Sequence, residues 1–327
     1  MTSDPGAPRP SGTFSLAGRP AAGLYLVGWL LTGVGLGLLF IALQVAPPSG
    51  GVLLMAALLL LGGGLSAAAG YQIVARRSLV PAAFHGASPP LLLGIQLILS
   101  VALGIPLLAL GLPDPTTSAV GFLVVSVTLM GTYLAVVWLF GVRTGVVSWS
   151  DMGLPSRVSV ARLLGDIGFG VGTMLIVWPL TTLLVVFLAL FLNSSPPDVV
   201  PPVQTATDTL LIALGAGLLV PIGEEVLFRG YALTAWLRDR GARSALIRST
   251  LFFSFAHILS VTASSFDDGA RQALLTVVVI TPVGAALGWI FLRRGLVAAI
   301  AGHATFNLIG VLIVALGQLL PQVPPPA

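Results

Sequence analysis

The sequence predicts an all-α protein, a polytopic transmembrane bundle of about nine spans, with eight as the lower limit. The first observation is composition: of 327 residues, 56% are hydrophobic and only 8% are charged, whereas soluble domains carry about 25% charged residues. The second is a series of apolar runs, each about 20 residues or more, the length that a ~30 Å hydrocarbon core requires. The third is an alternation of basic and acidic loops between these runs. A water-soluble fold of this size could not cover its surface with so few charges.

The apolar runs follow one another along most of the chain. The fifth and sixth are long, so we expect these helices to tilt or to protrude from the bilayer. The last two are separated only by Arg293, Arg294 and Gly295, which predicts a tight helical hairpin. The nine predicted spans cover approximately residues 24–46, 52–74, 91–111, 118–141, 164–192, 208–237, 245–264, 272–292 and 296–320.

The loops between the predicted spans differ in charge. Arginines precede the first span and follow the second, fourth, sixth and eighth, and all 15 basic residues of the chain are Arg. The opposite loops carry Asp114, Asp198, Asp267 and Asp268 with only Arg271. By the positive-inside rule, we expect a cytoplasmic N-terminus and an external C-terminus, which an odd number of spans also requires.

The predicted organisation has four parts. Residues 1–20, rich in Pro, Gly and Ser, form a disordered cytoplasmic tail. Residues 21–157 hold the N-terminal transmembrane helices and end in a linker, 144–157, that we expect to lie along the membrane interface. Residues 158–320 hold the remaining spans, and 321–327 form a Pro-rich tail. The protein is thus expected in the cell membrane (inner or plasma membrane), and arginine as the only basic residue type suggests a GC-rich bacterial genome.

Composition also excludes several classes of function. The chain has no Cys, which excludes disulfides, thiolate nucleophiles, iron–sulfur clusters and cysteine-based zinc sites. The net charge of +4 and the pI near 10.3 do not indicate nucleic-acid binding, because the arginines lie in short loops and form no continuous patch. The bilayer itself is therefore the first expected partner.

Ionisable side chains inside apolar spans are costly, so they are candidates for function. The sixth span contains Glu224, Glu225 and Arg229. The two glutamates are the only Glu among the 11 acidic residues of the chain. Glu225 and Arg229 are four residues apart, which places them on one helix face as an ion pair. Glu224 lies about 100° round the helix and is left without that partner.

Two of the three histidines also lie inside spans, His257 in the seventh and His303 in the ninth, where Asn307 follows four residues later. At about 1.5 Å per residue, Glu224, His257 and Asn307 lie roughly 18–20 Å from the ends of their spans that face the basic loops. This agreement predicts one buried site in the cytoplasmic half of the bilayer. A carboxylate, two imidazoles and a carboxamide suit the attack of water on an amide, with Glu as base, His orienting the water or binding a metal, and Asn as oxyanion donor.

Three motifs carry a resemblance to a known family. EEVLFR, residues 224–229, matches EExxxR, FSFAH, residues 253–257, matches FxxxH, and HATFN, residues 303–307, matches HxxxN. In this order on successive membrane helices, the chain resembles the CAAX prenyl protease and bacteriocin-processing (CPBP, Rce1-like) intramembrane proteases. The resemblance covers roughly residues 205–312 and implies that 158–320 form the protease core.

The resemblance also implies roles for the residues. Glu224 and His257 would activate the water, and His303 and Asn307 would support the oxyanion. Glu225, Arg229 and Phe253 would support the structure. The activity implied is that of an intramembrane endopeptidase acting on a membrane-associated protein or peptide. Eukaryotic relatives cleave prenylated CaaX tails, but nothing in this sequence indicates a prenyl ligand.

The cofactor is left open between two readings. Glu224, His257 and His303 form a possible three-ligand zinc site with an open fourth position, as in catalytic zinc sites, and the family is often called metalloprotease on that basis. Asn307, one turn from His303, fits an oxyanion donor better than a ligand. We therefore favour, by a small margin, a metal-free glutamate mechanism.

Two other classes of function compete with the peptidase. One is a non-catalytic CPBP-like membrane scaffold or immunity factor, which would not need Asn307 beside His303. The other is a proton-coupled transporter that uses the Glu and His residues as a relay, which predicts broken helices and a paired repeat. Pro221 and Gly223 are suited to break the sixth span, but the first half of the chain has no counterpart. His85 lies in a Pro-flanked loop and is expected to be an ordinary surface residue.

Overall fold

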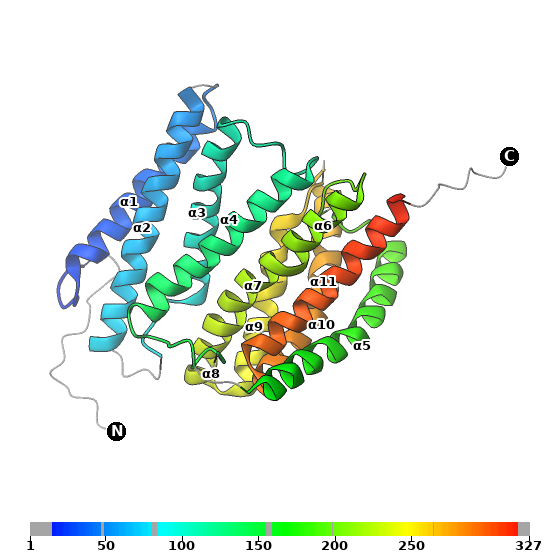
Figure 1. The fold of residues 1–327 in the computed structure, drawn as a ribbon. Coiled ribbons are helices and arrows are strands. Elements are labelled where there is room, and N and C mark those ends of the chain that lie inside the picture. The colour runs from blue at the N-terminus through cyan, green and yellow to red at the C-terminus, as the bar shows by residue number, and fades with distance from the viewer. Residues whose placement is uncertain are drawn as a thin grey trace. The chain divides into compact units, whose positions relative to one another are not determined.

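The computed structural model describes residues 15–319 except 47–48, 80–83, 155–158, 198 and 264. Most of the predicted N-terminal tail, the Pro-rich C-terminal tail, Asp198 and the end of the linker therefore lie outside the described residues. Within the described ranges every regular element is a helix, as predicted. The α-helices are α1 (Ala22–Ala42), α2 (Ser49–Leu79), α3 (Pro89–Ala109), α4 (Ala119–Val137), α5 (Val160–Leu192), α6 (Ala206–Leu214), α7 (Val220–Glu225), α8 (Thr234–Arg240), α9 (Ala242–Ala256), α10 (Phe266–Arg294) and α11 (Leu296–Leu319) (Figure 1).

Eight helical segments of the described chain are long and apolar enough to cross a membrane, which confirms the polytopic bundle. The seventh predicted span, 245–264, is shorter than expected, because α9 has 15 residues and ends in a four-residue 3₁₀ turn, η4 (His257–Ser260). At about 1.5 and 2.0 Å per residue, α9 and η4 together extend roughly 30 Å. A ninth crossing and the orientation of the chain in the membrane stay predictions.

The chain divides into two compact units. The first contains α1 to α3 and residues 135–148, and the second contains residues 110–134 and the helices from α5 onward. In the first unit α1 and α2 pack through glycines, since a Cβ on Gly28 or Gly64 would lie within 3.3 Å or 2.4 Å of the other helix. All the candidate site residues belong to the second unit. The boundary predicted at residue 157 is not tested by this division and stays a prediction.

In the second unit, α10 and α11 form the predicted tight hairpin. Only Gly295 separates them, and its φ of +85° is a backbone conformation that favours glycine. Helix α5 lies beside α11 (Figure 1), and the two backbones approach closely because both contribute glycines. A Cβ on Gly170 would lie 2.1 Å from the carbonyl oxygen of Ala298, and one on Gly302 would lie 3.2 Å from the carbonyl oxygen of Gly170. This contact fixes α11 one residue before His303.

The sixth predicted span is one continuous helical segment, 206–240, with two π-helical stretches, η2 (Gly215–Leu219) and η3 (Val226–Leu233). It begins at a capping box in which Thr205 and Asp208 satisfy each other's backbone N–H groups. Pro221 and Gly223 do not break it, contrary to what the transporter reading expects. The two π-helical stretches flank the Glu pair, and such stretches are frequent at functional sites.

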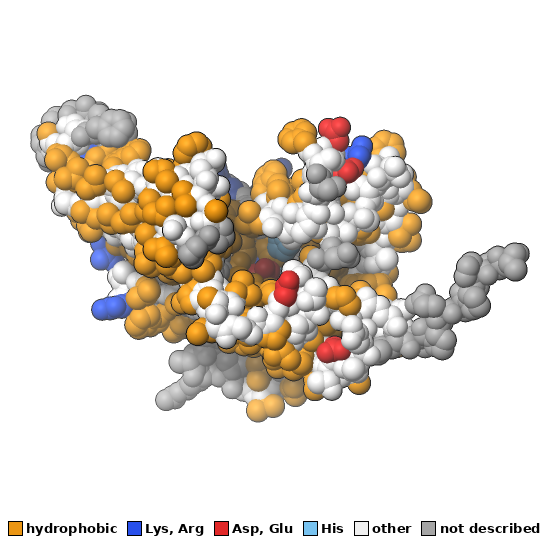
Figure 2. Space-filling view, turned by 90° about the horizontal axis from the view of Figure 1, so that it is seen from above, with side chains coloured by type: hydrophobic (Ala, Val, Ile, Leu, Met, Phe, Trp, Pro, Cys, Tyr) orange, Lys and Arg blue, Asp and Glu red, His pale blue; other side chains and the backbone are white. Residues whose placement is uncertain are grey.

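The face shown in Figure 2 carries large areas of hydrophobic side chains and few charged ones. In α5 only 6% of the most apolar window is buried, so this helix needs lipid to cover it. The linker 144–157 forms turns over the residues that the structure describes, with Trp149 at the surface and Met152 fully buried beside Gly230. An interfacial position fits Trp149, whereas Met152 anchors the linker to the helix that follows the Glu pair.

Candidate active site

A buried ion pair lies at the centre of the site. The guanidinium Nη1 of Arg229 donates to Oε1 of Glu225 at 2.7 Å, and both side chains are fully buried. Arg229 Nη2 also donates to the carbonyl oxygen of Gly284 in α10 at 3.2 Å. The ion pair expected from the i, i+4 spacing is therefore present, and it also links the helix of the Glu pair to α10.

His303 connects this ion pair to Glu224. Its Nδ1 lies 2.9 Å from Glu225 Oε1, and its Nε2 lies 3.8 Å from Glu224 Oε2. An ionised carboxylate can only accept hydrogen bonds, so Nδ1 of His303 carries a hydrogen and Nε2 faces Glu224. The bond to Glu225 joins residues 78 positions apart. Sequence reasoning missed it, because no local spacing signals a contact between α7 and α11.

The two glutamates are thus held in different ways. Glu225 is fully buried, and its Oε1 accepts from both Arg229 and His303. Glu224 keeps 15% of its side chain exposed and has only the His303 imidazole nearby as an ion-pair partner among the described residues. Glu224 is therefore the carboxylate that a substrate or a water molecule can reach.

His257 begins the 3₁₀ turn at the end of α9. Its Nδ1 lies 2.8 Å from the carbonyl oxygen of Phe253. Because a carbonyl only accepts, Nδ1 donates and the hydrogen sits on that nitrogen. In the neutral ring, Nε2 then carries a lone pair and can accept a hydrogen bond or bind a ligand.

Phe253 is the common neighbour of the charged groups. Its ring lies 4.0 Å from the Arg229 guanidinium carbon, and its centroid lies 4.4 Å from the His257 ring and 5.8 Å from the His303 ring. The cation over the ring face is attractive electrostatically, and Phe253 is only 1% exposed. This residue packs against both imidazoles and the guanidinium of the ion pair, and its supporting role stays a prediction.

Asn307 bonds to the helix that carries the Glu pair. Its Nδ2 donates to the carbonyl oxygen of Ala216 in η2 at 2.8 Å. In a π-helical stretch that oxygen would accept from the N–H five residues later, as Gly215 does from Val220, but residue 221 is a proline without N–H. Asn307 therefore supplies the donor that Pro221 lacks, and its second N–H remains for another acceptor.

The possible zinc site was predicted from three residues, Glu224, His257 and His303. Within the described ranges, no group of three His, Asp or Glu side chains is placed to hold a metal ion. Nε2 of His303 and Oε2 of Glu224, 3.8 Å apart, could serve as two ligands of one ion, since two ligand atoms of a tetrahedral zinc lie about 3.3 Å apart and a metal-bound His usually donates its other N–H to a carboxylate. Catalytic zinc needs a third protein ligand, and no third His, Asp or Glu among the described residues is placed with these two. The chemistry below therefore uses the side chains themselves.

Comparison with known proteins adds independent support. Residues 206–309 match the family described as type II CAAX prenyl endopeptidase Rce1-like. No curated protein and no solved structure gives a significant match. The matched segment starts at α6 and ends two residues after Asn307, so it contains all three motifs and the hydrogen-bonded groups around them. The resemblance read from the motifs is confirmed over residues 206–309, the segment that matches the model of the Rce1-like type II CAAX prenyl endopeptidase family.

Proposed function

We propose that the chain is an intramembrane endopeptidase that hydrolyses a peptide bond of a membrane-associated protein or peptide. One observation carries this proposal: of two adjacent glutamates, Glu225 is neutralised by Arg229, while Glu224 is partly exposed beside the Nε2 of His303. A purely structural pair would not need a second carboxylate at the cost of burying it in a membrane.

In the proposed reaction, Glu224 accepts a proton from a water molecule as the water oxygen attacks the carbonyl carbon of the peptide. The lone pair on Nε2 of His257 orients that water. Glu224 then returns the proton to the amide nitrogen as the C–N bond breaks, which leaves a carboxylic acid and an amine. The proton taken from water thus ends on the leaving amine, and no co-reactant is needed.

The oxyanion of the tetrahedral intermediate would be supported by His303 and Asn307. Asn307 can offer the N–H that does not bond to Ala216. His303 can donate through Nε2 only as imidazolium, because Nδ1 already donates to Glu225. Glu225 is then a positioning residue: it orients the imidazole, and Arg229 fixes Glu225.

The substrate must reach a site in the membrane, so it is expected to be membrane-associated rather than nucleic acid or a soluble protein. The active site is proposed to lie in the cytoplasmic half of the bilayer, an inference that rests on the loop arginines. The competing readings predict other outcomes: a scaffold would cleave nothing, and a transporter would show proton-coupled flux in vesicles.

Glu224→Gln tests the proposal. The amide keeps the shape and hydrogen bonding of the carboxyl group but cannot accept the proton, so turnover of a membrane-anchored peptide library should fall to background. His257→Ala should be nearly as severe, because the water loses its second partner. His85→Ala, in the first unit, is the control and should retain full activity. Full turnover by correctly folded Glu224→Gln would refute the assignment of roles.

A further inference from the structure

A second polar site lies at the N-terminal end of α11. A pocket of ≈ 480 Å³ opens where α5 and α11 begin and α10 ends. Its lining includes Arg162 and Asp166 of α5, and Arg293, Arg294 and Gly295 of the α10–α11 turn. Three arginines against one aspartate give this lining a net charge of +2. Neither the candidate active site nor the family motifs use these residues.

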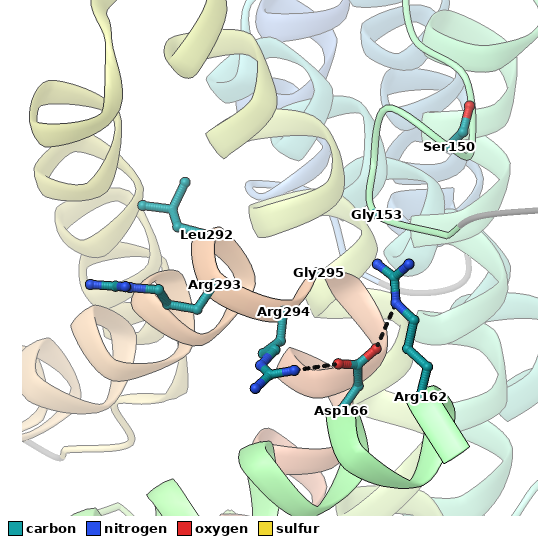
Figure 3. Close-up of a pocket in the computed structure, with 8 residues that line it drawn as sticks. All are labelled: Ser150, Gly153, Arg162, Asp166, Leu292, Arg293, Arg294 and Gly295. Atoms are coloured by element: carbon teal, nitrogen blue, oxygen red, sulfur yellow. Dashed lines mark ion pairs between the residues drawn. The ribbon is translucent and has the colours of Figure 1, made fainter. Parts of the chain in front are cut away.

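Asp166 lies between two of the arginines (Figure 3). Its Oδ2 is 3.8 Å from Arg162 Nε, and its Oδ1 is 3.7 Å from Arg294 Nη1. These distances are too long for hydrogen bonds, so the carboxylate attracts the guanidinium groups without using their N–H donors. No other hydrogen bond of these two guanidinium groups is found within the described ranges, and both remain more than half exposed. The N–H groups of Arg162 and Arg294 can therefore bind one anion together.

The pocket has the surroundings of a membrane interface. Arg162 lies in the first turn of α5, and the α10 arginines lie in its last turn. Trp289 is partly exposed one turn before them and packs 5.3 Å from Phe169 of α5. Trp is enriched at the level of the lipid headgroups. In Figure 3 Arg293 points away from Asp166, and its guanidinium carbon lies 5.6 Å from the Trp289 ring.

An apolar surface begins directly beside the pocket. Leu163 and Leu164 follow Arg162 and are both exposed, and Ile176 and Leu183 continue the exposed surface along α5. These exposed aliphatic side chains are suited to contact the acyl chains of lipids. A ligand with one anionic group and a long apolar part would therefore contact the arginines and α5 together.

We propose that this pocket binds the phosphate headgroup of an anionic glycerophospholipid, whose acyl chains lie along α5. Arg162 and Arg294 bind the phosphate oxygens, and Asp166 holds the two guanidinium groups on either side of the pocket. Basic pockets between transmembrane helices bind anionic headgroups in this way. The proposal does not depend on the peptidase function, because its readout is bound lipid and not cleavage.

The test measures lipid retained by the full-length protein in nanodiscs that contain equal amounts of phosphatidylglycerol and phosphatidylcholine, by native mass spectrometry after extraction. The wild type should retain phosphatidylglycerol preferentially. The triple variant Arg162→Gln/Asp166→Asn/Arg294→Gln removes both arginines without leaving an unpaired carboxylate, so it should stay folded. We expect its preference to fall by about fivefold for each arginine lost. Arg248→Gln removes one exposed arginine elsewhere in the same unit and should change nothing.

Two results would overturn the proposal. One is an unchanged phosphatidylglycerol preference in the triple variant, with a gel-filtration profile equal to the wild type. The other concerns the source of the phosphate: inorganic phosphate at millimolar concentration should not displace the retained lipid, whereas short-chain phosphatidylglycerol should. Displacement by both to the same extent would mean that the site recognises phosphate without the lipid, and the lipid assignment would be wrong.

Discussion

The sharpest prediction concerns Arg229→Ala. Among the described residues, Arg229 is the only arginine paired with Glu225, at 2.7 Å, and both side chains are fully buried. Truncation to Ala removes this partner and leaves the Glu225 carboxylate to the His303 Nδ1 alone. It also removes the guanidinium from the face of Phe253 and from the Gly284 carbonyl. Three contacts, two of them to other helices, are therefore lost with one side chain.

The expected loss is large because of burial. Breaking a buried ion pair by removing one partner typically costs about 3–5 kcal/mol, against a total stability of roughly 5–15 kcal/mol for an ordinary domain. Glu224→Gln leaves no charge unpaired, because the nearest ion-pair partner is His303 at 3.8 Å. We expect it to cost less than about 1 kcal/mol, the value of one ordinary hydrogen bond.

The assay is the folded fraction that remains in detergent after heating, measured by gel filtration. Arg229→Ala should lose folded protein at a much lower temperature than the wild type, and Glu224→Gln should follow the wild type. The double variant Glu225→Gln/Arg229→Met removes both charges and should recover much of the loss, since buried ion pairs are often replaceable by uncharged residues. Equal losses in Arg229→Ala and Glu224→Gln would contradict the division of roles between the two glutamates.

Three further predictions use other parts of the structure. A single Cys introduced at Ser49, in a chain without native Cys, should be labelled only from outside the cell, and labelling only from the cytoplasm would contradict the predicted topology. Purified active protein should keep its activity in a chelator, whereas stoichiometric zinc with activity lost to chelator and restored by zinc would overturn the metal-free proposal. Gly170→Ala should lower thermal stability by roughly 1–3 kcal/mol through overpacking, because the new Cβ would lie 2.1 Å from the Ala298 carbonyl oxygen; the matched control Gly172→Ala, whose Cβ meets nothing within 4 Å, should be close to neutral.

Much of the fold follows from hydropathy alone, because a membrane span needs only a sufficient length of apolar residues. Residues 245–264 show the limit of that reasoning. The run is apolar enough to predict a span although it contains Arg248 and His257, but the α-helix ends at Ala256 and a 3₁₀ turn starts at His257. Hydropathy does not distinguish an α-helix from a tighter turn. It also does not predict the π-helical stretches at Gly215–Leu219 and Val226–Leu233, because these differ from an α-helix only in backbone hydrogen bonding.

The site was predictable to the extent that it depends on local helical spacing. Glu225 and Arg229 share a face at i, i+4 whatever the tertiary structure, and the structure has the pair. The contact of Glu225 with His303 depends on how α11 packs against the helix of the Glu pair, which the close approach at Gly170 and Gly302 helps to fix. Such packing leaves no periodic signal in the sequence, so local spacing predicts the bond of Glu225 to Arg229 but not its bond to His303.

Asn307 is the residue in which structural and catalytic roles overlap. It donates to the Ala216 carbonyl because Pro221 cannot, so Asn307→Ala should cost stability as well as activity. An unpaired Ala216 carbonyl should lower the free energy of unfolding by about 1–3 kcal/mol. Loss of one oxyanion donor should lower kcat by a factor of roughly 10²–10³.

Pro221→Ala separates the loss of stability from the loss of activity. Residue 221 regains a backbone N–H, which can bond to the Ala216 carbonyl in place of Asn307. In the Pro221→Ala background, Asn307→Ala should lose little stability, and a double-mutant cycle should show this coupling. The loss of activity should remain at its full size, since the oxyanion donor is still absent. If Pro221→Ala instead rescued the activity of Asn307→Ala along with its stability, the role of Asn307 would be structural alone, and the oxyanion would have to be stabilised by His303.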